Sequence, residues 1–437
     1  MPNKVKTSSE VLVVGAGPVG MFTALRLAEG GIGVQLIDQE SRTAGHSYAC
    51  ALHPRTLQML DEVGVARDAI KLGHRIETVA FYEGNLKRAE LKLSLLPVEF
   101  PFVLVLQQNI LEGLLEQKLR QRAGLQVRWN HQLTDLTMKN GSAIATINEL
   151  AMEGKGYGVP DFEMAVKKTV SVCADFVVGA DGQGSLVRQR LDIECERVGQ
   201  PELFVVYEFE TEANLPPEMR IVLDQHTAGV LWPFTQHQGR WSFQWLQPDA
   251  PADFPQKVRG LDTIVDSAGP EDSRHHLQKL LSARAPWFQD EIKDVGWATD
   301  IQFEHRLARQ FGRDRAWLAG DAAHQTGPVG MQSMNTGFRE GADLAAKLTR
   351  IMRDQGSPDL LETYNLEHRL EWEQLLGWKG GPQASALTGK WIRECSARIP
   401  ACIPASGTEL TLLLQQLGLE YEPPHLHKVE AEAAILV

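Results

Sequence analysis

The chain has 437 residues, of which 43% are hydrophobic, and a formal net charge of −12. This length predicts two domains with a large core, and the negative charge argues against nucleic acid as a partner, because phosphate binding needs a basic surface. The sequence has no apolar run long enough for a membrane span and a polar start without a signal region, so we expect a cytoplasmic protein. The 5 cysteines form no C-x-x-C pair, which predicts reduced thiols and no metal site.

The first chemically informative segment lies near the N-terminus. The apolar stretch Val11–Val14 leads into the pattern G-x-G-x-x-G and then into an amphipathic helix, and a second apolar stretch, Val34–Ile37, ends in Asp38. Glycines of this pattern admit a pyrophosphate to the helix N-terminus, and the distal acid accepts hydrogen bonds from a ribose diol. A chance glycine turn is the alternative. With strand, helix and acid all present, the pattern favours a dinucleotide site formed by Gly15, Gly17, Pro18, Gly20 and Asp38.

Two further segments each predict a buried strand that delivers an aspartate to a loop before a helix. One runs from Cys173 through apolar residues to Asp181, and Ser185 could cap the helix that follows. The other runs from the apolar residues 316–319 to Asp321 and a loop rich in glycine. Such a loop lets backbone N–H groups approach a ligand, and open α/β sheets bind ligands at the carboxyl ends of their strands. Each segment alone is also compatible with an ordinary strand-to-helix connection.

Together and in this order, the three segments resemble the fingerprints of the single-component FAD-dependent aromatic hydroxylases, typified by para-hydroxybenzoate hydroxylase. The resemblance covers about residues 8 to 370. It implies that Asp181 lies near the FAD pyrophosphate and the nicotinamide path, and that Asp321 binds the ribityl chain. The residues of these two loops that the resemblance assigns to the cofactor are Asp181, Gly320, Asp321, Pro328, Gly330, Met334 and Asn335.

The resemblance also implies positions around the flavin ring. It places Pro328 beside the isoalloxazine and the amides of Met334 and Asn335 at its N1/O2 edge. Arg55 resembles the family's R-T-L-E element, which lies by the cofactor, and Gln108 matches the glutamine of its Q-x-x-x-E element. For Arg55 the alternative is a surface arginine, and for Gln108 it is a solvated amide at a helix entry.

The implied activity is that of a monooxygenase. NADPH or NADH reduces FAD, O₂ adds as a flavin C4a-hydroperoxide, and one oxygen passes to an aromatic or other electron-rich small molecule while the other leaves as water. The substrate, the preferred nicotinamide and the choice between monomer and homodimer stay open. A flavin-dependent halogenase is one alternative, although its W-x-W-x-I-P signature is absent. A non-catalytic FAD-binding redox sensor is another, because it would keep the three motifs and lose turnover.

The predicted fold class is α/β, with an FAD-binding Rossmann-like domain of the glutathione-reductase type. A β-hairpin is expected around Asn140-Gly141, and residues 151–162 read as a loop. The FAD-binding domain is expected to be discontinuous and interleaved with an antiparallel-sheet substrate domain. The expected boundaries are 1–75, 100–190 and 300–355 for the FAD-binding domain, 76–99 and 191–299 for the substrate domain, and 356–437 for a C-terminal helical region.

Longer strands from about residue 190 to 300 indicate the sheet of the substrate domain. Trp241, Phe243 and Trp245 alternate along one of them, which favours sheet core over a substrate cage. Polar residues that point inward from this sheet would set specificity. The candidates, each more readily explained by a structural role than by catalysis, are Tyr207, Gln225, His226, Trp232 and Gln244.

The third segment departs from the common family wording P-P-x-G-G-Q-G-M-N. Met331 and Ser333 replace glycines, and Glu340 replaces an aspartate. We hypothesise that Met331 forms part of the substrate or oxygen pocket wall, and that Ser333 affects only the local backbone. His324 is interpreted as structural, because the flavin would carry the chemistry. Beyond the resemblance, residues 410–417 either cover the pocket or form a subunit contact.

Overall fold

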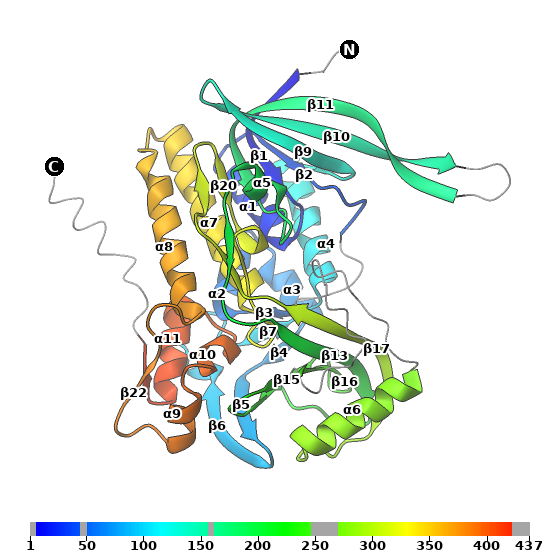
Figure 1. Ribbon diagram of the computed structural model, residues 1–437, viewed down its shortest axis with the longest axis vertical. Coiled ribbons are helices and arrows are strands. Elements are labelled where there is room, and N and C mark those ends of the chain that lie inside the picture. The colour runs from blue at the N-terminus through cyan, green and yellow to red at the C-terminus, as the bar shows by residue number, and fades with distance from the viewer. Residues whose placement is uncertain (1–5, 44–49, 156–160, 246–269, 422–437) are drawn as a thin grey trace.

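The computed structural model of the protein describes residues 6–43, 50–155, 161–245 and 270–421 (Figure 1). These residues form a mixed α/β fold in which a largely parallel sheet and a mainly antiparallel sheet lie at opposite ends of the molecule, with long helices beside the first. Among the described residues, no helix combines the length and the apolar character that crossing a membrane requires.

The first sheet is built on apolar strands that alternate with helices, the pattern that predicts parallel pairing. Val11, Leu12 and Val13 are fully buried, as expected for a strand covered on both faces. An antiparallel strand, β19 (Gly312–Arg313), adds an edge. The parallel strands, in order across the sheet, are β20 (Ala316–Leu318), β11 (Asp161–Gly179), β1 (Lys6–Val14), β2 (Val34–Ile37) and β8 (Val127–Arg128).

An antiparallel meander extends from the same sheet. Strand β9 (His131–Lys139) turns into β10 (Ser142–Lys155), which pairs with β11. The turn has φ values of 53° at Asn140 and 77° at Gly141, so the predicted hairpin is confirmed. The prediction of a loop over 151–162 is wrong at both ends, because β10 continues to Lys155 and β11 begins at Asp161. The glycines and the proline of this segment favour a loop, but strand pairing continues up to Lys155 and Asp161, and residues 156–160 lie outside the described residues.

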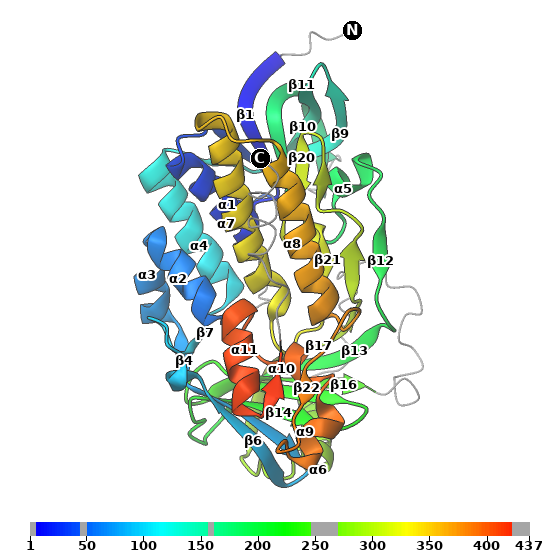
Figure 2. The same ribbon diagram turned by 90° about the vertical axis from the view of Figure 1, so that its left-hand side faces the viewer.

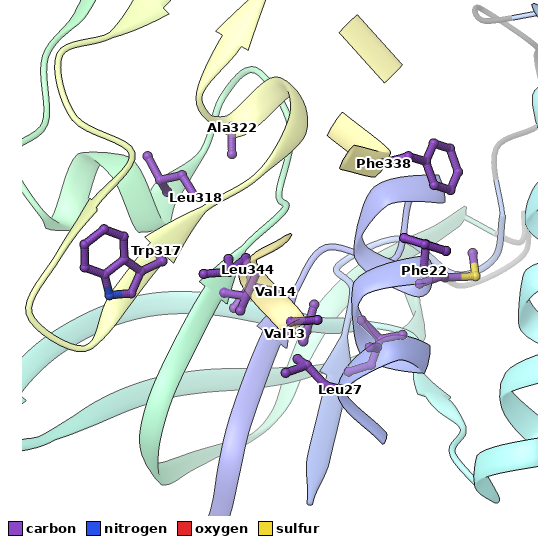
Figure 3. Packing of buried hydrophobic residues seen from close by; sticks show 14 of the residues in the cluster. Val13, Val14, Phe22, Leu27, Trp317, Leu318, Ala322, Phe338 and Leu344 are labelled. Carbon is purple, nitrogen blue, oxygen red and sulfur yellow. The ribbon is translucent and has the colours of Figure 1, made fainter. Parts of the chain in front are cut away.

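Helices α1 (Pro18–Glu29) and α7 (Gln332–Arg353) pack against each other beside the parallel sheet (Figure 3). Phe22 and Phe338 meet edge to face with ring centroids 5.0 Å apart. Gly341 permits this approach, because a Cβ at that position would lie 2.3 Å from a side-chain oxygen of α1. The apolar side chains of both helices and of the parallel strands form one buried cluster.

The second sheet has two buried faces. Val205, Tyr207 and Trp241 lie in a cluster with helix α6 (Pro270–Arg284), whereas Phe204 and Trp232 lie in a cluster on the opposite face. Trp241 and Phe243 are buried and stacked 4.8 Å apart, so the prediction of sheet core is confirmed for both. The strands, in order, are β17 (Ile292–Phe303), β13 (Glu202–Thr211), β16 (Gln238–Trp245), β15 (Ala228–Pro233), β14 (Glu218–Leu223), β5 (Thr78–Glu83) and β6 (Leu86–Lys92).

Short elements connect the two sheets, and the C-terminal helices lie against both α7 and the second sheet (Figure 2). The connecting elements are β3 (Ala51–Leu52), α2 (Pro54–Glu62), α3 (Ala66–Leu72), β4 (His74–Ile76), β7 (Val103–Val105), α4 (Gln108–Lys118), α5 (Leu186–Arg190), β12 (Cys195–Arg197), β18 (Arg306–Ala308) and β21 (His324–Gln325). The C-terminal elements are α8 (Asp359–Leu375), β22 (Gln383–Ala384), α9 (Lys390–Cys395), α10 (Ile399–Cys402), α11 (Gly407–Gln416) and β23 (Leu419–Glu420).

Candidate functional site

The three predicted motifs meet at one edge of the parallel sheet. Val14 of β1 pairs with Ile37 of β2 and with Gly179 of β11, and Gly179 pairs with Leu318 of β20. Because these strands are parallel, the residues that follow them emerge together at their carboxyl ends. The glycine loop, Asp38, the Asp181 loop and the Asp321 loop therefore form one continuous rim.

The glycines of the first loop differ in what surrounds them. Gly15 has φ +100°, and a Cβ there would lie 2.1 Å from the Ala180 carbonyl oxygen, so only glycine lets the first two loops touch. A Cβ on Gly20 would lie 2.0 Å from the Gly15 oxygen. Gly17, at the N-terminus of α1, has no atom within 4 Å of an added Cβ. The protein thus closes around two glycines and leaves the third open at a helix N-terminus, which fits an approaching pyrophosphate.

Asp38 is oriented by the backbone around it. Its Oδ2 accepts a hydrogen bond of 2.6 Å from the Ala16 N–H, and its Oδ1 accepts one of 2.9 Å from the Glu40 N–H. The half-buried carboxylate consequently lies beside the glycine loop, where a ribose hydroxyl could reach it.

The Asp181 carboxylate accepts its hydrogen bonds from the helix start that follows it. Oδ1 accepts from the Ser185 hydroxyl at 2.6 Å, and Oδ2 accepts from the backbone N–H groups of Leu186 and Val187 at 2.7 and 3.1 Å. Ser185 Oγ in turn accepts from the Arg188 N–H, so the predicted cap is confirmed. Burial raises the pKa of Asp181 despite these bonds. The aspartate therefore shapes the start of α5.

Arg188 links the second and third loops, and sequence reasoning gave it no role. The guanidinium is buried and donates to the Ala322 carbonyl at 2.6 Å and to the Gln183 carbonyl at 2.8 Å. An arginine seven residues after a motif aspartate looks like an ordinary helix residue in the sequence. Its place inside the Asp181 segment was the only available indication.

Asp321 begins a buried polar chain. Its Oδ1 accepts from the Ser333 hydroxyl at 2.7 Å, and Ser333 Oγ lies 3.2 Å from His324 Nδ1. His324 Nε2 lies 2.9 Å from Glu340 Oε2, and the Trp372 indole N–H donates to Glu340 Oε1 at 2.7 Å. The prediction that Ser333 affects only the local backbone is wrong, because its side chain bonds the motif aspartate. Helix periodicity does not reveal that Ser333 lies under the preceding strand end.

The loop of residues 328–331, which the resemblance places beside the flavin ring and which is called the flavin-ring loop below, is held by the Asn335 side chain. The side chain of Asn335 accepts at Oδ1 from the His53 N–H and the Thr56 hydroxyl, both at 2.8 Å, and donates to the carbonyls of Ala51 and Met331. This network fixes the loop against β3 and α2. Pro328 and Gly330 are buried and Met334 is half-buried. The Asn335 side chain is thus structural, and only its backbone amide stays available for the predicted contact.

Met331 adopts the left-handed backbone conformation that usually favours glycine. It has φ +51° and ψ +40°, and its side chain is buried in the apolar cluster that also contains Trp232. Arg55 on α2 donates to Gln58 at 2.7 Å, and Gln108 on α4 donates to Glu112 at 2.8 Å. Both are half-buried, so their assignment to the cofactor stays a prediction.

The structure does not gather the predicted substrate residues. Trp232 shares a cluster with Met331, whereas Tyr207 lies on the opposite sheet face, where its hydroxyl bonds His276 at 2.9 Å. Gln225 and His226 are exposed in the turn between β14 and β15. Strand alternation accounts for this separation, because odd and even positions point to different faces. Gln244, on β16, donates to Glu202 at 3.0 Å, within a polar group rather than an apolar pocket.

The C-terminal segment contributes contacts that the sequence left undecided. A Cβ on Gly330 would lie 2.5 Å from the Ala401 oxygen, and the buried Gln332 amide donates to the carbonyls of Ile403 and Ala405 at 2.5 and 2.8 Å. Residues 410–417 lie mostly in α11, and Leu410, Leu413, Leu414 and Leu417 are buried in the cluster around Met331. The segment therefore covers the flavin-ring loop within the same chain.

Glycines and aspartates at the ends of parallel strands define this protein as an α/β dinucleotide-binding protein. Comparison with known proteins assigns the family: residues 8–378 match the FAD binding domain family, and the chain belongs to it. FAD is accordingly the cofactor that the open rim is suited to hold. Among the described residues, no cluster of three or more histidine, cysteine, aspartate or glutamate side chains could hold a metal ion.

Several relatives are named monooxygenases. The chain is 28% identical over 370 residues to pentachlorophenol 4-monooxygenase of Sphingobium chlorophenolicum, covering 84% of this chain and 63% of the relative. It is 26% identical over 431 residues to para-nitrophenol 4-monooxygenase of Pseudomonas sp. (strain WBC-3), covering 94% and 95%. The chain thus spans under two thirds of the first relative and nearly all of the second.

Solved structures show the same fold. The crystal structure of p-nitrophenol 4-monooxygenase PnpA from Pseudomonas putida DLL-E4 superposes with a TM-score of 0.66 at 22% identity. The similarity covers 84% of this chain and 86% of that one. At this identity the likeness supports the fold alone.

Proposed function

We propose that the protein is an FAD-dependent monooxygenase that uses NADPH or NADH and O₂ to hydroxylate an aromatic small molecule. The observation that carries the proposal is the rim of three loops, in which Gly15 and Gly20 are sterically closed and Gly17 is open. Family membership supplies the cofactor, and the printed names of the relatives support the class of reaction.

The two sheets suggest a division of labour. We assign the parallel sheet to a glutathione-reductase-type FAD domain made of residues 1–75, 100–190 and 300–355. We assign the second sheet to a substrate domain made of residues 76–99 and 191–299, because β5 and β6 pair into the same sheet as β13–β17. This interleaving brings the second sheet against the flavin-ring loop.

Bound FAD would supply the chemistry, because its reduced ring activates O₂ for transfer of one oxygen atom to the substrate. The chain's own residues would bind the cofactor and enclose its ring. Gly17 and Asp38 would hold the pyrophosphate and the ribose, and Asp321 would accept from the ribityl hydroxyls. The buried loop Pro328–Met331 and the C-terminal segment would exclude water from the ring.

The cluster around Met331 indicates an apolar substrate. It joins Val329 and Met331 of the flavin-ring loop to Phe204 and Trp232 of the second sheet. The buried Trp232 indole N–H has no hydrogen-bond partner among the described residues. We propose that it donates to a polar substituent of the aromatic ring, since a buried donor without an acceptor is costly.

The test is steady-state turnover with a panel of phenols, scored as hydroxylated product and as H₂O₂ per NAD(P)H oxidised. Product formation that depends on a phenol supports the proposal; substrate-independent peroxide, or no NAD(P)H oxidation by flavin-loaded protein, contradicts it. Trp232→Phe should raise KM, whereas Trp241→Phe is the matched control, because the Trp241 N–H is also buried without a described partner but lies on the α6 face. Equal KM values in both variants would remove Trp232 from the substrate site.

A further inference from the structure

The polar chain behind Asp321 has no counterpart behind Asp181. Both aspartates accept from a serine hydroxyl, Ser333 at 2.7 Å and Ser185 at 2.6 Å. Ser185 Oγ accepts from the Arg188 backbone N–H, which can only donate a hydrogen bond. Ser333 Oγ instead faces the imidazole of His324, whose Nδ1 can either donate or accept. Only the Asp321 serine therefore joins two titratable side chains.

The hydrogen-bond donors around Glu340 indicate where the protons lie in this polar network. Glu340 accepts from the Gly320 N–H at 2.8 Å and from the Trp372 indole, and its Oε2 also faces His324 Nε2. Burial alone would raise the pKa of Glu340, but attraction to His324 and the bonds from His324 and Trp372 outweigh burial and lower it. Glu340 is consequently an acceptor throughout, and His324 Nε2 carries a proton.

One proton remains to be shared between Asp321 and His324. When Asp321 is a carboxylate, Ser333 donates to it and accepts from a protonated His324 Nδ1. When Asp321 is protonated, it donates a hydrogen bond to Ser333 Oγ, and the Ser333 hydroxyl donates a hydrogen bond to an unprotonated His324 Nδ1. Exchange between these two states moves one proton between Asp321 and His324 through Ser333 Oγ. The summed charge of the three side chains is unchanged, and no heavy atom need move.

Two contacts of Asp321 oppose the effect of burial on its carboxylate. The His324 ring is fully buried and stacks on the Trp372 indole with centroids 3.9 Å apart. Burial raises the pKa of the Asp321 carboxyl above its usual value, and the Ser333 hydroxyl and His324 offset only part of that rise. The charged and titratable groups packed around the polar chain include Arg339, Glu340 and Asp343 on α7, Tyr364, His368 and Glu371 on α8, and Arg188 on α5.

We propose that Ser333 is a positioning residue that couples Asp321 to His324 and thereby keeps the Asp321 carboxylate an acceptor for the ribityl hydroxyls of FAD. The inference rests on the proposed function, since it takes FAD to bind at this rim. The motif wording that the resemblance supplies has glycine at this position, so the coupling belongs to this chain's departure from that wording.

The experiment measures the Kd of apoprotein for FAD, by flavin fluorescence, between pH 8 and pH 6. Ser333→Ala removes a bond that lowers the Asp321 pKa, so the carboxylate is protonated at higher pH in the variant. The ratio of variant to wild-type Kd should therefore rise severalfold as the pH falls from 8 to 6, by up to about tenfold for each pKa unit by which the variant exceeds the wild type. Ser333→Gly should follow Ser333→Ala, and Ser333→Thr, which keeps the hydroxyl, should follow the wild type.

Ser185→Ala is the matched control. It removes an equivalent hydroxyl–carboxylate bond, but the Asp181 carboxylate accepts from its own helix start and is not an acceptor for FAD in this proposal, so its Kd ratio should stay constant over the same pH range. A constant ratio for both Ser333→Ala and Ser333→Gly would overturn the coupling. Wild-type protein that binds no FAD at any pH would instead refute the proposed function, so the two failures are distinguishable.

Discussion

The Asp181 and Asp321 loops follow neighbouring parallel strands, yet they use their aspartates differently. Asp181 accepts three hydrogen bonds from Ser185, Leu186 and Val187, all within its own helix start. Among the described residues, Asp321 accepts one side-chain bond, from Ser333. The same residue type at the same kind of strand end can therefore maintain a helix terminus in one loop and offer a carboxylate to a ligand in the other.

The largest expected effect comes from removing each aspartate. Asp181→Ala strips three donors of their acceptor and should lower the free energy of unfolding of the apoprotein by about 2–3 kcal/mol. Asp321→Ala should lower it by less than about 1 kcal/mol but weaken FAD binding about 10- to 100-fold, the range for a hydrogen bond to a charged group. Urea denaturation and FAD titration of both variants provide the measurements.

The comparison fails if the two variants behave alike. Asp38→Ala is the internal reference. Among the described residues the Asp38 carboxylate accepts only from backbone N–H groups, so the substitution should weaken FAD binding to a similar extent as Asp321→Ala. A large stability loss in Asp321→Ala would mean that the polar chain is chiefly structural.

A second prediction concerns the effect of pH on His53, which contacts the loop that follows Asp321. His53 Nε2–H donates to the Gly330 carbonyl at 2.9 Å, and burial lowers the pKa of His53 to about 3. In the unfolded chain His53 takes up a proton near pH 6.5, whereas in the folded chain it stays neutral. The free energy of unfolding therefore falls as the pH drops below 6.5. Between pH 7.5 and 5.5 this group should cost about 1.4 kcal/mol.

The measurement is the urea midpoint of wild type and His53→Gln at both pH values. The variant keeps an amide that can donate to Gly330 but does not titrate, so its midpoint should fall less than that of the wild type. Identical pH dependence in both proteins would show that other groups account for the loss.

The smallest expected effect belongs to Met331. A side chain at φ +51° is strained by about 1 kcal/mol or more, and glycine is not. Met331→Ala and Met331→Gly lose nearly the same packing, so the glycine variant should be more stable than the alanine variant by about 1 kcal/mol. Thermal unfolding of the two variants tests this directly; an alanine variant of equal or higher stability would mean that the loop relaxes out of the left-handed conformation.

Much of the architecture follows from local pattern. Apolar runs ending in glycine or aspartate predict strands that are parallel, and the Asn140-Gly141 turn is correctly placed because its φ values demand those residues. Family membership and the cofactor follow from the same motifs, whose spacing the chemistry of a dinucleotide constrains. These features are local, so the sequence alone carries them.

The missed features depend on contacts between distant segments. Arg188 reaches Ala322, Gln332 reaches Ile403 and Ala405, and Ser333 reaches back to Asp321 across a turn. No periodicity encodes which carbonyl a buried donor will meet. The substrate candidates scatter for the same reason, since alternation along a strand gives two faces without saying which face meets the flavin-ring loop.

The most direct test of the central claim is the flavin content of the purified protein and its loss in Gly17→Ala. We predict one non-covalently bound FAD per chain and a Kd for FAD at least about 10-fold weaker in Gly17→Ala, with unchanged apoprotein stability because an added Cβ meets nothing within 4 Å. Gly296→Ala, equally open but on β17, should bind FAD as the wild type does. FMN in place of FAD, no flavin after reconstitution, or an unchanged Kd in Gly17→Ala would contradict the account.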